Sequence, residues 1–149
     1  MLRPNSIVRL VLAASAVAVV SCRATPPRSD AGASRATPPA AATRIVRSQT
    51  LPEMDGKRLD VKLIEVSYPP GGASRAHRHP CAVFGYVLEG TLRSQVQGQA
   101  EGTYKAGDTF YEAPNGVHAV SANASSHEPV RFLATFICDS NAPLTTPVP

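Results

Sequence analysis

The sequence contains no tryptophan, and only four phenylalanines and four tyrosines occur among its 149 residues. Charged residues are also scarce at 17%, whereas hydrophobic residues make up 43% of the chain. Enough apolar side chains are therefore present for one small core, and a chain of this length has room for one domain rather than two. The same composition argues against a chain that is disordered throughout.

Most of the chain has no excess of positive or negative charge, although the formal net charge is +4. Five of the 15 basic residues but only one of the 11 acidic residues lie before Arg44, so the remainder is electrically balanced. A basic face of the kind that binds nucleic acid is therefore not predicted, and we expect no nucleic-acid partner.

The N-terminal apolar run at 10–20 is too short to cross a bilayer as a helix, which takes roughly 20 residues. It follows the basic residues Arg3 and Arg9, as in an export signal. The segment that ends at Cys22, Val-Val-Ser-Cys, resembles the bacterial lipobox, in which the cysteine is lipidated and becomes the N-terminus. We predict a signal peptide at 1–21 and a lipid on Cys22. Cleavage near Cys22 by an ordinary signal peptidase is the alternative.

Residues 22–43 are predicted to be a Pro/Ala-rich linker that follows the lipidated cysteine. The segment contains Arg-Ala-Thr-Pro-Pro twice, at 23–27 and 35–39, and has no aromatic residue that could build a core. Arg23 stands where an aspartate often signals retention at the inner membrane, which favours the outer membrane. We therefore expect an exported lipoprotein on the periplasmic side of a bacterial membrane, attached to it through the N-terminal lipid alone.

Short apolar runs separated by turn residues characterise the predicted domain at 44–141. Strands are predicted at 58–68, 83–88, 91–97, 109–113, 117–121 and 131–138. No stretch has the periodicity of an amphipathic helix of ten or more residues. The pattern predicts an all-β domain, an antiparallel sandwich or small barrel, followed by a flexible tail at 142–149.

Three of the four histidines are candidate metal ligands, and two of them are spaced so that their side chains can reach one point. His77 and His79 are two residues apart, and alternate residues of an extended strand project from the same face. His118 follows a turn and lies in a later predicted strand. Neutral imidazoles bind Fe, Mn, Ni, Cu or Zn, and three of them leave positions for water or substrate. We predict one divalent transition metal ion; a half-exposed strand pair is the alternative. His127 lies in a polar loop expected at the surface.

These histidines lie in two motifs that resemble those of the cupin superfamily. Gly71, His77, His79 and Gly90 have the spacing of the first motif, and Gly107 and His118 that of the second. The resemblance implies a jelly-roll barrel (a double-stranded β-helix) and a homodimer. It also implies metal-dependent chemistry of dioxygenase, isomerase or lyase type on a small molecule. A periplasmic cupin that binds a metal or small ligand without turnover is the alternative.

The sequence departs from the cupin pattern at the position of the motif's metal-binding glutamate. That position falls on Val83 or, at the other permitted offset, on Phe84, and neither side chain can bind a metal. Glu112, with the strand parity of Phe110, is our candidate catalytic residue, either near the metal or as a general base. A solvent-exposed carboxylate at a strand end is the alternative.

Two further pairs of side chains lie in the predicted strands. Arg93 and Gln95 share one face of a predicted strand, where they either line the pocket or face the solvent. Tyr86 and Tyr111 are expected in the barrel wall.

The cysteines beyond the lipobox leave several possibilities open. Cys81 and Cys138 can form a disulfide in an oxidising compartment. A single thiol beside the metal and ordinary buried cysteines are the alternatives.

Overall fold

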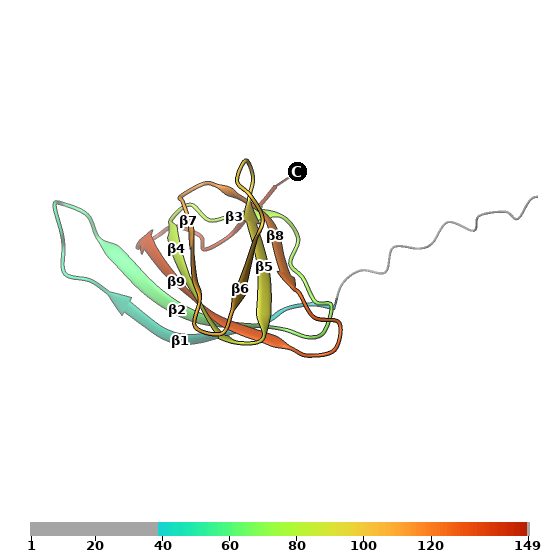
Figure 1. Ribbon diagram of the computed structural model, residues 1–149. Helices are drawn as coiled ribbons and strands as arrows, with labels where there is room; N and C mark the ends of the chain where they lie inside the picture. Colours follow the sequence, from blue (N-terminus) through green and yellow to red (C-terminus); the bar gives the residue numbers. More distant parts are fainter. Residues whose placement is uncertain (1–38, 149) are drawn as a thin grey trace, which may run out of the picture. The chain divides into compact units, whose positions relative to one another are not determined.

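The computed structural model describes residues 39–148, which contain ten β-strands and no helix (Figure 1). The strands are β1 (Ala42–Thr50), β2 (Leu59–Tyr68), β3 (His77–Arg78), β4 (Ala82–Glu89), β5 (Thr91–Val96), β6 (Gly102–Lys105), β7 (Thr109–Glu112), β8 (Val117–Asn123), β9 (Val130–Asp139) and β10 (Thr146–Pro147). The predicted signal peptide at 1–21, Cys22 and most of the predicted linker lie outside the described residues. Within 39–148, no helix is long and apolar enough to cross a membrane.

The strands form two five-stranded antiparallel sheets. The strand order is β1-β2-β9-β4-β7 in one sheet and β10-β3-β8-β5-β6 in the other. Consecutive strands lie in the same sheet only for β1 and β2 and for β5 and β6; at every other step from β2 to β10 the chain passes from one sheet to the other. These crossings are those of a jelly-roll barrel and confirm the prediction of an all-β cupin-like fold.

Alternation of side chains along the strands builds the core. In β9, Phe132, Ala134 and Phe136 are buried, whereas the intervening side chains lie on the outer face of the sheet. In β4, Val83 and Val87 point inward in the same way. Since successive side chains of a strand project to opposite faces, each sheet presents one apolar face to the barrel interior.

The six predicted strands are confirmed within two residues at each end, but β1, β3, β6 and β10 were missed. Strand β1 is exposed along its whole length, so it lacks the apolar alternation that marks a half-buried strand. The other three strands have only two or four residues each, which is too short for a period to be recognised.

The predicted flexible tail at 142–149 is wrong for its central part. Thr146 and Pro147 form β10, which pairs with β3, and Ala142 and Leu144 pack against the core. Strand β1 likewise begins at Ala42, so the folded region extends beyond the predicted range of 44–141 at both ends. The segment is rich in proline and is held by backbone pairing over two residues. Its sequence therefore has no apolar pattern from which a strand could be predicted.

Tyr86 and Tyr111 do not face the barrel interior but lie on its outer surface, with 45% and 50% of their areas exposed. The inward-facing residues of these strands are their neighbours Gly85 and Phe110, which lie opposite each other. A Cβ atom on Gly85 would approach the Phe110 ring to 2.1 Å, so a residue without a side chain suits this pair.

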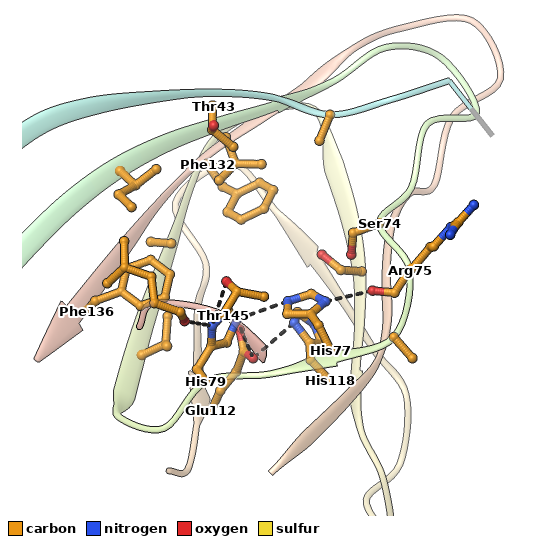
Figure 2. Close-up of a pocket in the computed structure, with 18 of the residues that line it drawn as sticks. Thr43, Ser74, Arg75, His77, His79, Glu112, His118, Phe132, Phe136 and Thr145 are labelled. Atoms are coloured by element: carbon orange, nitrogen blue, oxygen red, sulfur yellow. Dashed lines mark hydrogen bonds and ion pairs between the residues drawn. The ribbon is translucent and has the colours of Figure 1, made fainter. Parts of the chain in front are cut away.

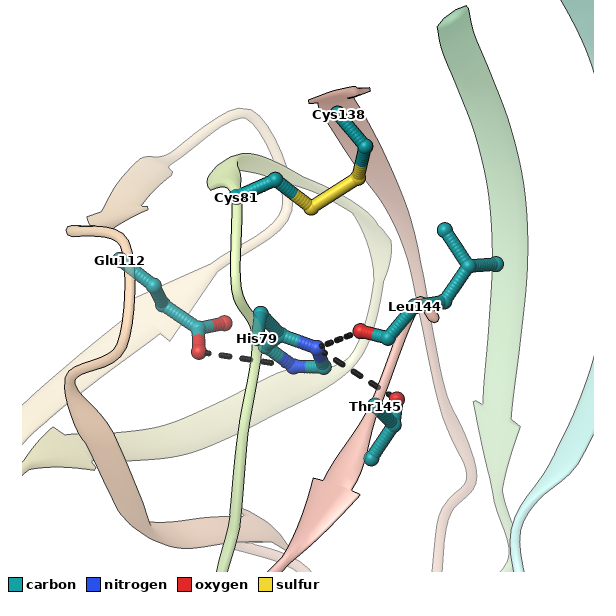
Figure 3. Close-up of a disulfide and its surroundings, with 6 residues drawn as sticks. All are labelled: His79, Cys81, Glu112, Cys138, Leu144 and Thr145. Atoms are coloured by element: carbon teal, nitrogen blue, oxygen red, sulfur yellow. Dashed lines mark hydrogen bonds and ion pairs between the residues drawn. A yellow bond between two sulfur atoms is a disulfide. The ribbon is translucent and has the colours of Figure 1, made fainter. Parts of the chain in front are cut away.

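Cys81 and Cys138 form a disulfide, with their Cα atoms 4.8 Å apart (Figure 3). The bond joins Cys81, which immediately precedes β4, to Cys138 near the end of β9. Cys81 is two residues along the chain from His79. Because both sulfur atoms are used, the alternatives of a lone thiol beside the metal and of free buried cysteines are wrong.

Replacing both Cys81 and Cys138 by alanine removes a cross-link that spans 57 residues of sequence. The unfolded chain then gains conformational entropy, so the free energy of unfolding should fall by about 2–5 kcal/mol. Denaturant unfolding followed by circular dichroism measures this change. A reductant should destabilise the original chain by a similar amount and leave the double variant unaffected. An original chain that is insensitive to reductant would contradict the cross-link.

Candidate metal centre

Strand pairing brings the three predicted histidines together inside the barrel. His77 in β3 lies directly opposite His118 in β8, and His79 follows β3 by one residue. One ring nitrogen from each side chain lies within 4.8 Å of those of the other two (Figure 2). His79 and His118 are buried, and His77 is partly buried. The three residues therefore form one potential metal-binding group.

Backbone carbonyls determine which ring nitrogens of two histidines are protonated. Nδ1 of His77 lies 2.7 Å from the carbonyl oxygen of Arg75, and Nδ1 of His79 lies 2.5 Å from that of Leu144. A carbonyl oxygen only accepts hydrogen bonds, so each Nδ1 carries the proton. In the neutral rings, each Nε2 is then left with a lone pair.

Those two Nε2 atoms face each other at a distance of 3.0 Å. With both rings neutral, two lone pairs oppose each other, and either an additional proton or a metal cation removes the conflict. Burial, the largest cause, lowers the pKa of His77, and the neighbouring imidazoles act in the same direction. Because an additional proton is disfavoured there, the arrangement suits a metal cation.

His118 is held by a contact with a serine of β5. Its Nε2 lies 2.9 Å from the hydroxyl oxygen of Ser94, and its buried Nδ1 has no hydrogen-bond partner. Sequence analysis did not identify Ser94 as a site residue. Its strand parity, opposite to that of Arg93 and Gln95, is the one signal that could have found it.

Glu112 is buried beside the histidines, with only 5% of its area exposed, so the alternative of a solvent-exposed carboxylate is wrong. Its Oε2 atom lies 3.0 Å from Nδ1 of His118 and 3.7 Å from Nε2 of His79. Strand β7 places it there, because Phe110 and Glu112 share the inward face. Its catalytic role stays a prediction.

Arg93, Gln95 and His127 lie away from this cluster. Arg93 pairs with Glu101 on the surface at 2.5 Å, and Gln95 donates a hydrogen bond to a backbone carbonyl in the following turn. The option that Arg93 and Gln95 line the pocket is therefore wrong. His127 is exposed, as expected.

The histidines and Glu112 occupy the polar end of a cavity of about 780 Å³ (Figure 2). The apolar part of its lining comes mainly from one sheet, through β2, β4 and β9, and from the C-terminal segment: Ile64, Val66, Val83, Phe132, Ala134, Phe136 and Leu144. Tyr68 adds a hydroxyl that lies 2.8 Å from Oγ of Ser121, and burial raises the pKa of this phenol. Tyr68 therefore stays a neutral hydroxyl in the wall.

Comparison with known proteins agrees with this architecture. A family model described as the cupin domain matches residues 64–136. The lyase DddQ from Ruegeria pomeroyi, named as acting on DMSP, is 16% identical with a TM-score of 0.54; the match covers 69% of this chain and 49% of the lyase. This chain thus spans about half the length of that enzyme.

Two further structures have the same fold. A cupin domain from Bordetella pertussis is 22% identical with a TM-score of 0.51, over 68% of this chain and 96% of that one. An oxalate oxidase is 25% identical with a TM-score of 0.50, over 59% of this chain and 46% of that one. No protein of curated function matches the sequence. The family match and these neighbours support the cupin superfamily, and the three grouped histidines support a metal-binding cupin.

Removal of the C-terminal segment should weaken metal binding, because the Leu144 carbonyl and β10 hold His79 and His77 in position. For a chain that ends at Asn141, we expect the dissociation constant for Co²⁺ to rise by about 10–100-fold. A chain that ends at Pro147 keeps both contacts and serves as the control. Competition with a coloured chelator measures both constants, and equal values would show that the segment has no positioning role.

Proposed function

We propose that this protein binds one divalent transition metal ion through His77, His79 and His118 and acts on a small molecule in the adjoining cavity. The convergence of three imidazoles at the polar end of an otherwise apolar cavity carries this proposal. In His77 and His79 the Nδ1 atoms are protonated, so the facing Nε2 lone pairs suit a bound cation better than they suit each other.

A metal ion held by imidazoles keeps open positions and polarises the oxygen atoms of a substrate, which suits dioxygenase, isomerase or lyase chemistry. The chain itself supplies orientation and a dry environment. The Arg75 and Leu144 carbonyls hold two imidazole rings in one orientation, and Ser94 holds the third. The apolar wall excludes water, which strengthens electrostatic interactions at the polar end.

The shape of the cavity indicates a class of substrate. One end offers nitrogen and oxygen ligands, and the remaining wall is lined mainly by aliphatic and phenyl groups. A site of this kind fits a small molecule with metal-chelating oxygen atoms at one end and an apolar body at the other.

We further propose that the protein acts outside the cytoplasm, as a lipoprotein on the periplasmic side of a bacterial membrane, with the outer membrane favoured. The export-signal pattern predicted at 1–21 and the lipobox-like segment at Cys22 support this location. The Cys81–Cys138 disulfide is of a kind that persists in oxidising compartments. The homodimer implied by the cupin resemblance stays a prediction.

Elemental analysis combined with an activity screen tests the proposed function. The full chain, purified without chelators, should hold about one equivalent of metal. Iron or manganese together with turnover of a chelating oxygen compound would support the enzyme. Tightly held zinc or nickel without turnover would instead indicate a protein that binds a metal or small ligand and does not catalyse.

The variant His77→Ala should lose its metal while the barrel stays folded, because only one of three ligands and a partly buried side chain are removed. Metal content is measured by elemental analysis after dialysis, and folding by circular dichroism. His127→Ala, which changes an exposed histidine, is the control and should keep full metal content. Full metal content in His77→Ala would refute the three-histidine assignment.

Affinity for simple carboxylates should increase with the length of their alkyl chain. In the Co²⁺-loaded protein, each methylene buried along the apolar wall should contribute up to about 0.8 kcal/mol, or about fourfold in Kd, between acetate and hexanoate. Ala134→Leu, which narrows that wall, should reduce the gain, whereas Thr135→Leu on the outer face should not. Spectral titration measures the constants, and affinity independent of chain length would contradict the proposed substrate class.

A further inference from the structure

Strand pairing places Glu112 directly across from the position where the first cupin-like motif lacks its glutamate. Of the two candidate positions, Val83 and Phe84, only Val83 faces the barrel interior, and it lies in β4 opposite Glu112 in β7. Both side chains face the barrel interior, with 1% and 5% of their areas exposed. Side chains directly opposite each other on one face of an antiparallel pair have Cβ atoms about 5 Å apart. A carboxylate on β7 can therefore reach the region that a side chain at position 83 would reach.

The Oε2 atom of this carboxylate is buried without a hydrogen-bond partner. Among the described residues, three buried side-chain nitrogen or oxygen atoms form no hydrogen bond: Oγ of Ser74, Oε2 of Glu112 and Nδ1 of His118. The last two are 3.0 Å apart, yet they are not oriented to bond each other. Leaving a buried carboxylate oxygen unpaired is costly, so a cation that contacts both atoms would be favourable there.

The unpaired Oε2 atom of Glu112 lies beside the histidine cluster. Oε2 of Glu112 is also 3.7 Å from Nε2 of His79, which in turn faces Nε2 of His77 at 3.0 Å. With neutral imidazoles, the four side chains carry one buried negative charge. A divalent cation among them neutralises this charge and gives each unpaired atom a partner.

We propose that Glu112 is the fourth protein ligand of the metal, so that strand β7 supplies the carboxylate that the first motif lacks at position 83. The inference rests on the proposed metal site and adds to it. The ligand set is then three imidazole nitrogens and one carboxylate oxygen, with the carboxylate displaced to the neighbouring strand.

The variant Glu112→Gln tests this assignment, because it keeps the size of the side chain and replaces an anionic donor by a neutral one. Affinity of the full chain for Co²⁺, measured by competition with a coloured chelator, should fall by at least about tenfold. The visible absorption of the bound Co²⁺ should also change, since it responds to the ligand set. Glu128→Gln, at an exposed glutamate, is the matched control and should leave affinity and spectrum unchanged.

A carboxylate swap across the strand pair provides the second test. Glu112→Val should bind Co²⁺ more weakly than the original chain. Adding Val83→Glu, which restores the carboxylate on β4, should recover affinity relative to Glu112→Val alone. A swapped chain that folds but binds no better than Glu112→Val would overturn the proposed placement. If the swapped chain does not fold, Glu112→Gln decides.

The possible outcomes separate this inference from the proposed function. If the original chain binds Co²⁺ and Glu112→Gln has the same affinity and spectrum, the metal site stands and Glu112 is not a ligand. If the original chain binds none of Co²⁺, Mn²⁺ or Zn²⁺, both proposals are wrong, and Glu112 and His118 form only a buried ion pair.

Discussion

Two imidazole nitrogens with lone pairs, facing each other at 3.0 Å inside the barrel, are the constraint on which the rest of the site depends. The conflict exists because the Arg75 and Leu144 carbonyls each accept a hydrogen bond from the single N–H group of a neutral ring, which leaves both Nε2 atoms unprotonated. Contact between two nitrogen lone pairs is unfavourable by itself, but the same arrangement is favourable when both lone pairs bind one cation. The neighbouring atoms without partners, on His118 and Glu112, point to the same requirement.

The jelly-roll fold supplies both the positioned histidines and the apolar wall of the site. Pairing of β3 with β8 sets His77 opposite His118, and pairing of β10 with β3 brings the C-terminal segment beside His79. The other sheet contributes an apolar wall through β2, β4 and β9. A disulfide two residues from His79 ties the start of β4 to the end of β9 (Figure 3). Rigid elements on several sides therefore hold the ligands in position.

Sequence reasoning predicted what depends on local pattern and missed what depends on pairing between strands. The alternation in 131–138 and the turn residues between runs are local, and they led to the all-β fold. The His77–His79 spacing is local as well. That Glu112 lies opposite Val83, however, follows from the register of β4 and β7, which no local pattern contains. The contacts of Ser94 with His118 and of the Leu144 carbonyl with His79 were not predicted for the same reason.

X-ray absorption spectroscopy on the metal-loaded full chain tests the central claim most directly, because it reports which atoms surround the ion. The account predicts a first shell of nitrogen and oxygen only, with the multiple scattering of about three imidazole rings. No sulfur is expected, since Cys81 and Cys138 are bonded to each other. A sulfur ligand, or a shell with no more than one imidazole, would contradict the account.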